Sequence, residues 1–352
     1  MKIDYIIVGQ GLAGSAVALE LITRGKRIVV FDKPDENRAS SVAAGLFNPI
    51  TGRRHVKTWK ADETFSCLHQ FYLNVEKKLK RKFFYPATIY HPFASMQEQN
   101  DWMGKSADSS ISQYIHQIFT GPHFQSQVND PWGGVLLSQC GYLEAKSFMQ
   151  CVREALIRTE AYKVEKFEEE KISFDGETVV YGDLRADKII FCTGIEALRS
   201  SLFGWLPLVP LKGEVFEIRI DQDLKCIYNS GVYIVQTGKK GRYKVGSTYS
   251  LTDQSQSVTE LARKELTDKL SDLLSIPFEI TAQHWGIRPA IRDRRPVMGP
   301  HPKFKNMVIF NGLGTKGVSL APYFSVRLVN WLEGKQNIEP EIDISRFYKE
   351  FK

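Results

Sequence analysis

The sequence predicts an α/β protein in which a domain built on parallel strands is interleaved with an α+β domain on a mostly antiparallel sheet. The first 32 residues show the order strand, helix, strand, because two unbroken apolar runs flank a segment with apolar residues at helical spacing. Residues 209–248 change to alternating apolar and polar positions, which is typical of antiparallel strands. The length of 352 residues exceeds one ordinary hydrophobic core and favours two domains.

Each element follows from its local pattern. Residues 5–8 and 28–31 are apolar runs typical of buried parallel strands, and Gly25 closes the helix expected at 15–23. Residues 83–135 are irregular and rich in aromatic side chains, and we interpret them as an insertion that leaves the first domain. Further helices are expected at 62–82, 144–159, 260–274 and 320–332, and further buried strands at 188–192 and 307–310. The predicted domains are residues 1–75, 140–206 and 296–352 for the first, and residues 76–139 and 207–295 for the second.

The composition is that of an ordinary globular protein, with a formal net charge of +7 that attracts anionic ligands. The five cysteines form no C-x-x-C pair and their odd number suits a reducing compartment, so no metal site is expected. The N-terminal apolar run is too short for a signal peptide, and no stretch reaches the roughly 18 apolar residues of a membrane span. We therefore expect cytoplasmic residence and no membrane span.

Glycines and an acidic residue mark the first strand–helix–strand unit. In the run GQGLAG, Gly9 permits a tight turn, Gly11 lets the backbone approach a pyrophosphate, and Gly14 allows the helix to pack on the strand. The helix that follows offers N–H donors and the positive end of its dipole. Asp32 ends the second strand at the offset of a residue that accepts hydrogen bonds from ribose hydroxyls. The pattern predicts a Rossmann-type dinucleotide site for a ribose without a 2′-phosphate.

Three further segments extend this site, although the first two do not separate NAD from FAD. Residues 40–46 carry small side chains and hydroxyl groups, which suit a long ligand or an ordinary surface turn. The strand at 188–192 ends in Thr193 and Gly194, as strands beneath the nucleotide of flavoproteins do, and as any core strand can. The turn at 312–317 opens the last helix and offers N–H groups to a flavin pyrimidine ring, which gains negative charge on reduction.

Arg288 is the candidate substrate-binding residue. It stands beside Pro289 in an apolar context, and the fork of an arginine matches the two oxygens of a carboxylate. The alternative is a structural arginine that pairs with Asp293. The residues themselves leave both interpretations open.

Eight segments together resemble the D-amino-acid oxidase superfamily, in order and over nearly the whole chain, and are closest to its glycine oxidase and sarcosine oxidase branch. They are GQGLAG, FDK, SSVAAG, FCTG, KGE, GVYIV, GIRPAIRDRRPVMG and GLGTKG. The first is shared by many nucleotide folds, whereas the last two, at this separation, are fairly specific. The resemblance implies FAD bound non-covalently, since no cysteine follows Cys226 to provide a flavin link near Arg288. It also favours Arg288 as the residue that binds a substrate carboxylate, with Tyr233 and Tyr249 facing the same pocket.

The resemblance and the glycine turns together define the expected FAD site. Its residues are Gly9, Gly11, Leu12, Ala13, Gly14, Asp32, Lys33, Ala39, Ser40, Ser41, Ala44, Gly45, Leu46, Thr193, Gly194, Gly312, Leu313, Gly314, Thr315, Lys316, Gly317, Val318 and Ser319.

The family implies oxidation of the C–N bond of a small amino acid or N-methyl amine, with hydride transfer from the α-carbon to flavin N5. The protein supplies orientation and electrostatics, so no catalytic side chain is assigned. In the family, O2 usually reoxidises the flavin. Because Thr315 and Lys316 depart from the residues common in characterised oxidases, the electron acceptor stays open between O2 and another acceptor.

Two alternatives remain. The first is a tRNA-modification oxidase that removes a carboxymethyl group from a wobble uridine; only here is a nucleic acid partner expected. The stretch 44–49 and a basic run fit this alternative; the run comprises Arg53, Arg54, His55, Lys57 and Lys60. The second alternative is a non-catalytic FAD-binding redox protein.

Overall fold

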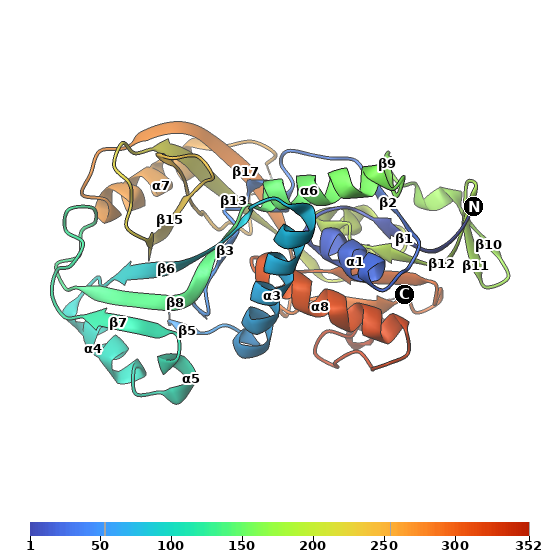
Figure 1. Ribbon diagram of the computed structural model, residues 1–352, viewed down its shortest axis with the longest axis horizontal. Helices are drawn as coiled ribbons and strands as arrows, with labels where there is room; N and C mark the ends of the chain where they lie inside the picture. The colour runs from blue at the N-terminus through green and yellow to red at the C-terminus, as the bar shows by residue number, and fades with distance from the viewer. Residues whose placement is uncertain (53, 254, 352) are drawn as a thin grey trace.

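The computed structural model, which describes residues 1–52, 54–253 and 255–351, places two large sheets toward opposite ends of an elongated molecule (Figure 1). The N-terminus lies beside the first sheet, and helix α7 (Glu260–Leu273) covers the second. Helices α3 (Ala61–Leu79) and α8 (Gly317–Leu332) pack against each other between them. The predicted fold class, a Rossmann-type domain combined with a mostly antiparallel α+β domain, is confirmed.

The first sheet has the strand order β10-β11-β12-β1-β2-β9, with β19 beside β12 and β18 beside β19. Its centre is parallel, from β9 through β2, β1 and β12 to β19, and apolar runs bury both faces of the four inner and C-terminal strands β2, β1, β12 and β19. The strands are β1 Lys2–Val8, β2 Ile28–Asp32, β9 Tyr162–Val164, β10 Ile172–Asp175, β11 Thr178–Tyr181, β12 Leu184–Phe191, β18 Val297–Pro300 and β19 Met307–Asn311.

Helices α1 (Leu12–Thr23) and α6 (Ala145–Arg158) accompany this sheet, and α1 packs on α8. Helix α3 ends at Leu79 rather than at the expected residue 82, because Lys80 adopts a left-handed conformation with a φ of 52° and caps the helix. Helix α8 begins at Gly317, three residues before the expected start at 320, so the last glycine of the turn is already helical. Short 3-10 helices lie at η1 Glu169–Lys171, η2 Gly194–Arg199 and η3 Ile344–Glu350.

The second sheet has the order β17-β13-β16-β15-β14-β6-β8-β3, with β7 beside β8. All of its pairs are antiparallel except β14 with β6, as the period of two in residues 209–248 predicts for the central strands. The strands are β3 Leu46–Phe47, β6 Phe84–Pro92, β7 Ile115–Phe119, β8 Gly134–Leu143, β13 Leu208–Arg219, β14 Ile227–Ser230, β15 Val232–Gln236, β16 Arg242–Gly246 and β17 Glu279–Ile291.

Residues 83–135 are more regular than the sequence suggests. They form β6, β7 and the start of β8 together with helices α4 (Met96–Lys105) and α5 (Ser109–Ser112). Most aromatic side chains of this segment are core residues: Phe84, Tyr90 and Trp102 are at most 1% exposed, whereas Trp132 is 39% exposed. Bulges in the pairing of β6 and β7 with β8 break the alternation that would have revealed the strands.

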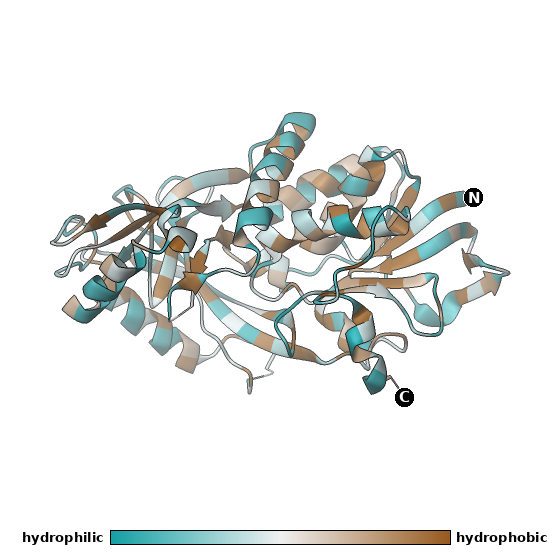
Figure 2. Ribbon diagram, turned by 90° about the horizontal axis from the view of Figure 1, so that it is seen from below, coloured by the Kyte–Doolittle hydropathy of each residue, from teal (hydrophilic) through white to brown (hydrophobic). Residues whose placement is uncertain are grey.

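The domain boundaries stay a prediction. Strand β3 lies within the first predicted domain but pairs with β8 of the second sheet, so the chain passes between the sheets at this point. A small hairpin of β4 (Ile50–Thr51) and β5 (Val56–Lys57) follows. Apolar residues run along the strands, and polar residues gather on outer helix turns and loops (Figure 2). Among the described residues no helix has both the length and the apolar character needed to cross a membrane.

Candidate active site

One cleft joins the two glycine turns that lie about 300 residues apart in the sequence. The turn after β1 contributes residues 11–13, and the turn before α8 contributes residues 313–315, 317 and 318. Expected site residues that line the cleft are Gly11, Leu12, Ala13, Ala39, Ser40, Ala44, Gly45, Leu46, Gly194, Tyr233, Arg288, Leu313, Gly314, Thr315, Gly317 and Val318.

The first turn depends on glycine at two positions for packing and at a third for access. Gly9 has a φ of 92°, and a Cβ at Gly14 would lie 1.9 Å from the Gly9 carbonyl oxygen. Gly11 faces the cleft, where a Cβ would meet only Ser40 Oγ, at 3.4 Å. A side chain at Gly11 would therefore occupy space that a ligand needs while barely disturbing the protein. This cradle fits a pyrophosphate held at the start of α1.

Asp32 lies behind this turn rather than in the cleft. Its carboxylate is 3% exposed and accepts hydrogen bonds from the backbone N–H of Gln10 at 3.0 Å and the hydroxyl of Tyr162 at 2.9 Å. It also pairs with Arg38, whose Nη1 lies 3.1 Å from Asp32 Oδ1. Arg38 in turn donates to the carbonyl of the exposed Lys33 at 2.8 Å. The sequence did not single out Tyr162 or Arg38, and the ribose contact of Asp32 and Lys33 stays a prediction.

The second turn is held by Asn311, which sequence reasoning did not include. Its side-chain amide donates to the Gly194 carbonyl at 2.8 Å, and its Oδ1 accepts from the Gly312 N–H at 2.8 Å. The bond to Gly194 joins the end of β19 to the end of β12, where Thr193 and Gly194 lie. Gly312 has a φ of 76°, and its missing side chain leaves room for Ile291. The α8 N-terminus therefore opens into the cleft beside Gly314 and Thr315.

Some expected site residues do not line the cleft. Lys316 is one: its Nζ lies 3.4 Å from the hydroxyls of Thr51 and Thr58, and burial, with Arg295 nearby, lowers its pKa. The residues in this group are Gly9, Gly14, Asp32, Lys33, Ser41, Thr193, Gly312, Lys316 and Ser319.

Arg288 lines the cleft with a guanidinium that is only partly hydrogen-bonded. Its Nη2 donates to Ser247 Oγ at 2.7 Å, whereas Nη1 is buried and has no hydrogen-bond partner among the described residues. Asp293 pairs with Arg346, at 2.9 Å, so the alternative role of Arg288 as its partner is wrong. A Cβ at Gly213, on the neighbouring strand β13, would lie 2.3 Å from Nη1, so the glycine provides the space that the guanidinium occupies.

The two expected tyrosines differ in position. Tyr233 on β15 lines the cleft. Its hydroxyl lies against Gly246, since a Cβ added to that glycine would be only 2.7 Å from the hydroxyl oxygen. Burial raises the pKa of Tyr233, against an opposing effect of the Arg288 charge, so the phenol stays neutral and able to donate. Tyr249 is 54% exposed and does not line the cleft. Burial lowers the pKa of Arg288, while Tyr233 and Tyr249 oppose that shift.

Five further residues line the cleft that the sequence did not assign: Ala43, Cys192, Ser247, Pro289 and Asn311. Ala43, Pro289 and Asn311 stand next to assigned residues, so extending each motif by one position would have found them. Ser247 gives no such signal, because only the pairing of β13 with β16 and β17 brings it to Arg288. Burial raises the pKa of the Cys192 thiol, which makes it a packing residue rather than a nucleophile.

A larger cavity of about 640 Å³ lies elsewhere, between α3 and the β6–β8 pair. Its lining includes Asp62, His69, Tyr114 and Cys140, and none of the expected site residues. The convergence of two helix N-termini and an arginine with an unpaired nitrogen, rather than size, therefore identifies the active-site candidate.

Comparison with known proteins agrees with this site. Residues 4–331 match the family described as FAD dependent oxidoreductase, DAO. The glycine oxidase of Pseudomonas aeruginosa is 24% identical, over 97% of this chain and 97% of that protein. The tRNA 5-methylaminomethyl-2-thiouridine biosynthesis bifunctional protein MnmC of Marinobacter nauticus is 25% identical over 92% of this chain, which spans 54% of that relative.

Solved structures show the same fold. The crystal structure of glycine oxidase from Bacillus cereus superimposes with a TM-score of 0.81 at 21% identity, covering 95% of this chain and 96% of that one. An L-α-glycerophosphate oxidase from Mycoplasma pneumoniae with FAD bound gives a TM-score of 0.75 at 16% identity, covering 98% of this chain and 99% of that one. Together with the cleft, these matches establish that the chain belongs to the DAO family of FAD-dependent oxidoreductases.

Proposed function

We propose that this oxidoreductase oxidises the C–N bond of a small amino acid or N-methyl amine that carries a carboxylate. The buried Nη1 of Arg288 is the observation that carries the proposal, because a buried charged donor without a partner is costly unless a ligand satisfies it. A substrate carboxylate beside Arg288 supplies that partner. The glycine oxidases among the relatives support a substrate of this size.

The side chains of the cleft orient the substrate and do not remove a proton from it. Arg288 holds the carboxylate, Ser247 fixes the guanidinium, and Tyr233 donates from the same side. No aspartate, glutamate, histidine or lysine stands among the described residues that line the cleft. The amine must therefore react in its neutral form, without a side-chain base. Bound FAD would accept the hydride from the carbon next to nitrogen.

The test is anaerobic reduction of the FAD-loaded enzyme by glycine, sarcosine and a series of small D-amino acids. We expect at least one to bleach the flavin absorbance, and the amine that lacks its carboxylate to bleach it much more slowly. Bleaching at equal rates with and without the carboxylate, or by no amine at all, would contradict the proposal. Reoxidation of the bleached enzyme by O2 then distinguishes an oxidase from a dehydrogenase.

The MnmC relatives support the tRNA alternative, but part of the basic run is already paired within the chain. Lys57 pairs with Asp62, and Lys60 pairs with Glu339 at 2.9 Å. His55 faces Glu98, and Arg53 lies outside the described residues. Two lysines of the run thus already have acidic partners within the chain, which favours the small substrate. Tight tRNA binding that weakens steeply with salt would instead support the alternative.

A further inference from the structure

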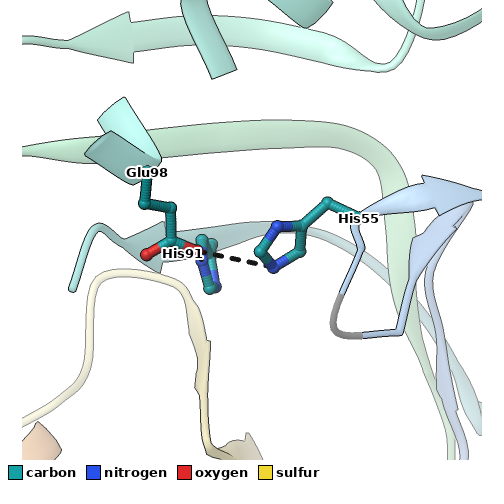
Figure 3. A group of neighbouring side chains, drawn as sticks. All are labelled: His55, His91 and Glu98. Carbon is teal, nitrogen blue, oxygen red and sulfur yellow. Dashed lines mark hydrogen bonds and ion pairs between the residues drawn. The ribbon is translucent and has the colours of Figure 1, made fainter. Parts of the chain in front are cut away.

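Three residues from separate segments bring ligand atoms together at the end of the β4–β5 hairpin (Figure 3). His55 lies between β4 and β5, His91 is on β6, and Glu98 is in the first turn of α4. Their nearest nitrogen and oxygen atoms all lie within 4.8 Å of one another. Among the described residues this is the one group of three or more such side chains with metal-ligand spacing.

The hydrogen bonds of His91 fix which of its nitrogens faces the group. Nδ1 lies 2.6 Å from the carbonyl oxygen of Asn229 and must donate to it, because a carbonyl only accepts. In the neutral ring Nε2 then carries a lone pair, yet it faces Glu98 Oε1 at 2.9 Å. Two acceptors at this distance require a cation or a second proton between them. An Nδ1–H bonded to a backbone carbonyl is also the usual support of a histidine that binds metal through Nε2.

Glu98 is held in place independently of the histidines. Its Oε2 accepts from the backbone N–H of Ala94 at 2.7 Å, while its own N–H donates to Ser95 Oγ at 3.2 Å. These two bonds cap the start of α4 in the manner of a capping box, with the N–H of Ala94 in place of that of the N-cap residue Ser95. Oε1 is left directed at His91 and at His55 Nε2, 3.6 Å away.

We propose that His55, His91 and Glu98 bind one zinc ion, with water in the fourth position. Tetrahedral zinc with bonds of about 2.0–2.2 Å sets ligand atoms roughly 3.3 Å apart, between the two separations to Glu98 Oε1. The three side chains are 21%, 12% and 20% exposed, so they enclose an ion but leave it an entry path and room for water. The proposal does not depend on the proposed function.

Zinc at this position would tie the β4–β5 hairpin to the second sheet. Thr51 ends β4 and Thr58 directly follows β5, and the hydroxyls of both contact Lys316 of the second glycine turn. The other side of the site belongs to β6 and α4. The ion would therefore stabilise the contact between the cofactor turn and the substrate side. Sequence reasoning considered cysteine spacing alone and missed the group, because its members are far apart in sequence.

The test measures zinc binding by equilibrium dialysis on FAD-loaded, untagged enzyme that has been treated with a chelator. We expect one zinc ion per chain in the wild type, with affinity at least tenfold weaker in His55→Ala, His91→Ala and Glu98→Gln. Glu98→Gln is the sharpest variant, since glutamine also serves in a capping box and keeps the α4 N-terminus. His116→Ala, an exposed histidine on β7, is the matched control and should bind as the wild type does.

A second measurement separates a site from loose surface binding. Zinc should raise the melting temperature of the wild type and of His116→Ala, and should leave that of Glu98→Gln nearly unchanged. Failure of the wild type to bind one ion would overturn the proposal and would assign the short His91–Glu98 contact to a proton. Equal affinity in Glu98→Gln and the wild type would overturn it as well. Flavin absorbance of each variant reports that it is folded.

Discussion

Two cations on neighbouring strands show why Arg288 is informative. Lys212 on β13 is 2% exposed, and its Nζ contacts Asp253 at 2.7 Å, Glu214 at 3.4 Å and two oxygens of the following loop. Arg288 on β17 is half-buried, but its Nη1 is enclosed without a partner, and Ser247 is its only side-chain partner among the described residues. A fully compensated charge is explained by the fold itself. A charged group that lacks a partner at the wall of the cofactor cleft is instead explained by a ligand that binds there.

Replacing Arg288 by alanine should raise KM for the carboxylated substrate more than tenfold. A charge-assisted hydrogen bond contributes about 1.5–3 kcal/mol, and about 1.4 kcal/mol corresponds to a factor of ten. Steady-state kinetics with whichever amino acid bleaches the flavin measure the effect. Arg292→Ala is the control, because that side chain is 65% exposed and binds Glu350. An unchanged KM in Arg288→Ala would remove the residue from substrate binding.

At the scale of elements, two glycines in the turn between β1 and α1 have different roles, although they look alike in the sequence. Gly14 brings α1 against the turn, where the Gly9 carbonyl leaves no space for a side chain. Gly11 faces the cleft and has space on the protein side. One position therefore serves the fold and the other serves the ligand.

Alanine substitutions at Gly11 and Gly14 should separate cofactor binding from packing. In Gly11→Ala we expect the FAD dissociation constant to rise more than tenfold and the melting temperature of the FAD-free protein to stay the same. In Gly14→Ala the FAD-free protein should melt earlier, because overpacking costs about 1–3 kcal/mol. Fluorescence titration with FAD and thermal unfolding measure the two effects. A lower melting temperature in both variants would show that Gly11 is also a packing residue.

The sequence predicted those elements whose signal is local. The apolar runs of β1 and β2 and the alternation in β13–β16 depend on periods that neighbouring residues set. The glycine turns were predicted for the same reason, since steric demands fix their residues. Sequence patterns did not reveal Ser247, Arg38 or the His55–His91–Glu98 group. Strand pairing and loops bring these side chains to their partners, and such contacts leave no characteristic short motif in the sequence. Residues 83–135 were missed because bulges hide their alternation.

At the scale of the whole molecule, the cleft is where segments from distant parts of the chain meet. The first turn and the segment around Ala44 approach from the N-terminal part, Gly194 follows β12, and Arg288 and the second turn come from the C-terminal part. The α3–α8 contact and the packing of η2 against β13 and β17 provide further connections between the two halves. A ligand that fills the cleft therefore connects both ends of the molecule, and its removal should affect the fold as a whole.

Removing FAD should lower the melting temperature by about 4 °C when the holoenzyme is measured at 100 times the dissociation constant, because binding then contributes about 2.7 kcal/mol. Fragments of the cofactor test whether both turns act together. ADP reaches the turn at Gly11, and riboflavin reaches the turn at Gly314, so each alone should restore only part of the shift. Differential scanning calorimetry with FAD, ADP and riboflavin measures all three. If ADP alone restored the whole shift, the second turn would contribute nothing to cofactor binding, and the shared cleft would not be the reason that two such distant glycine turns occur in one chain.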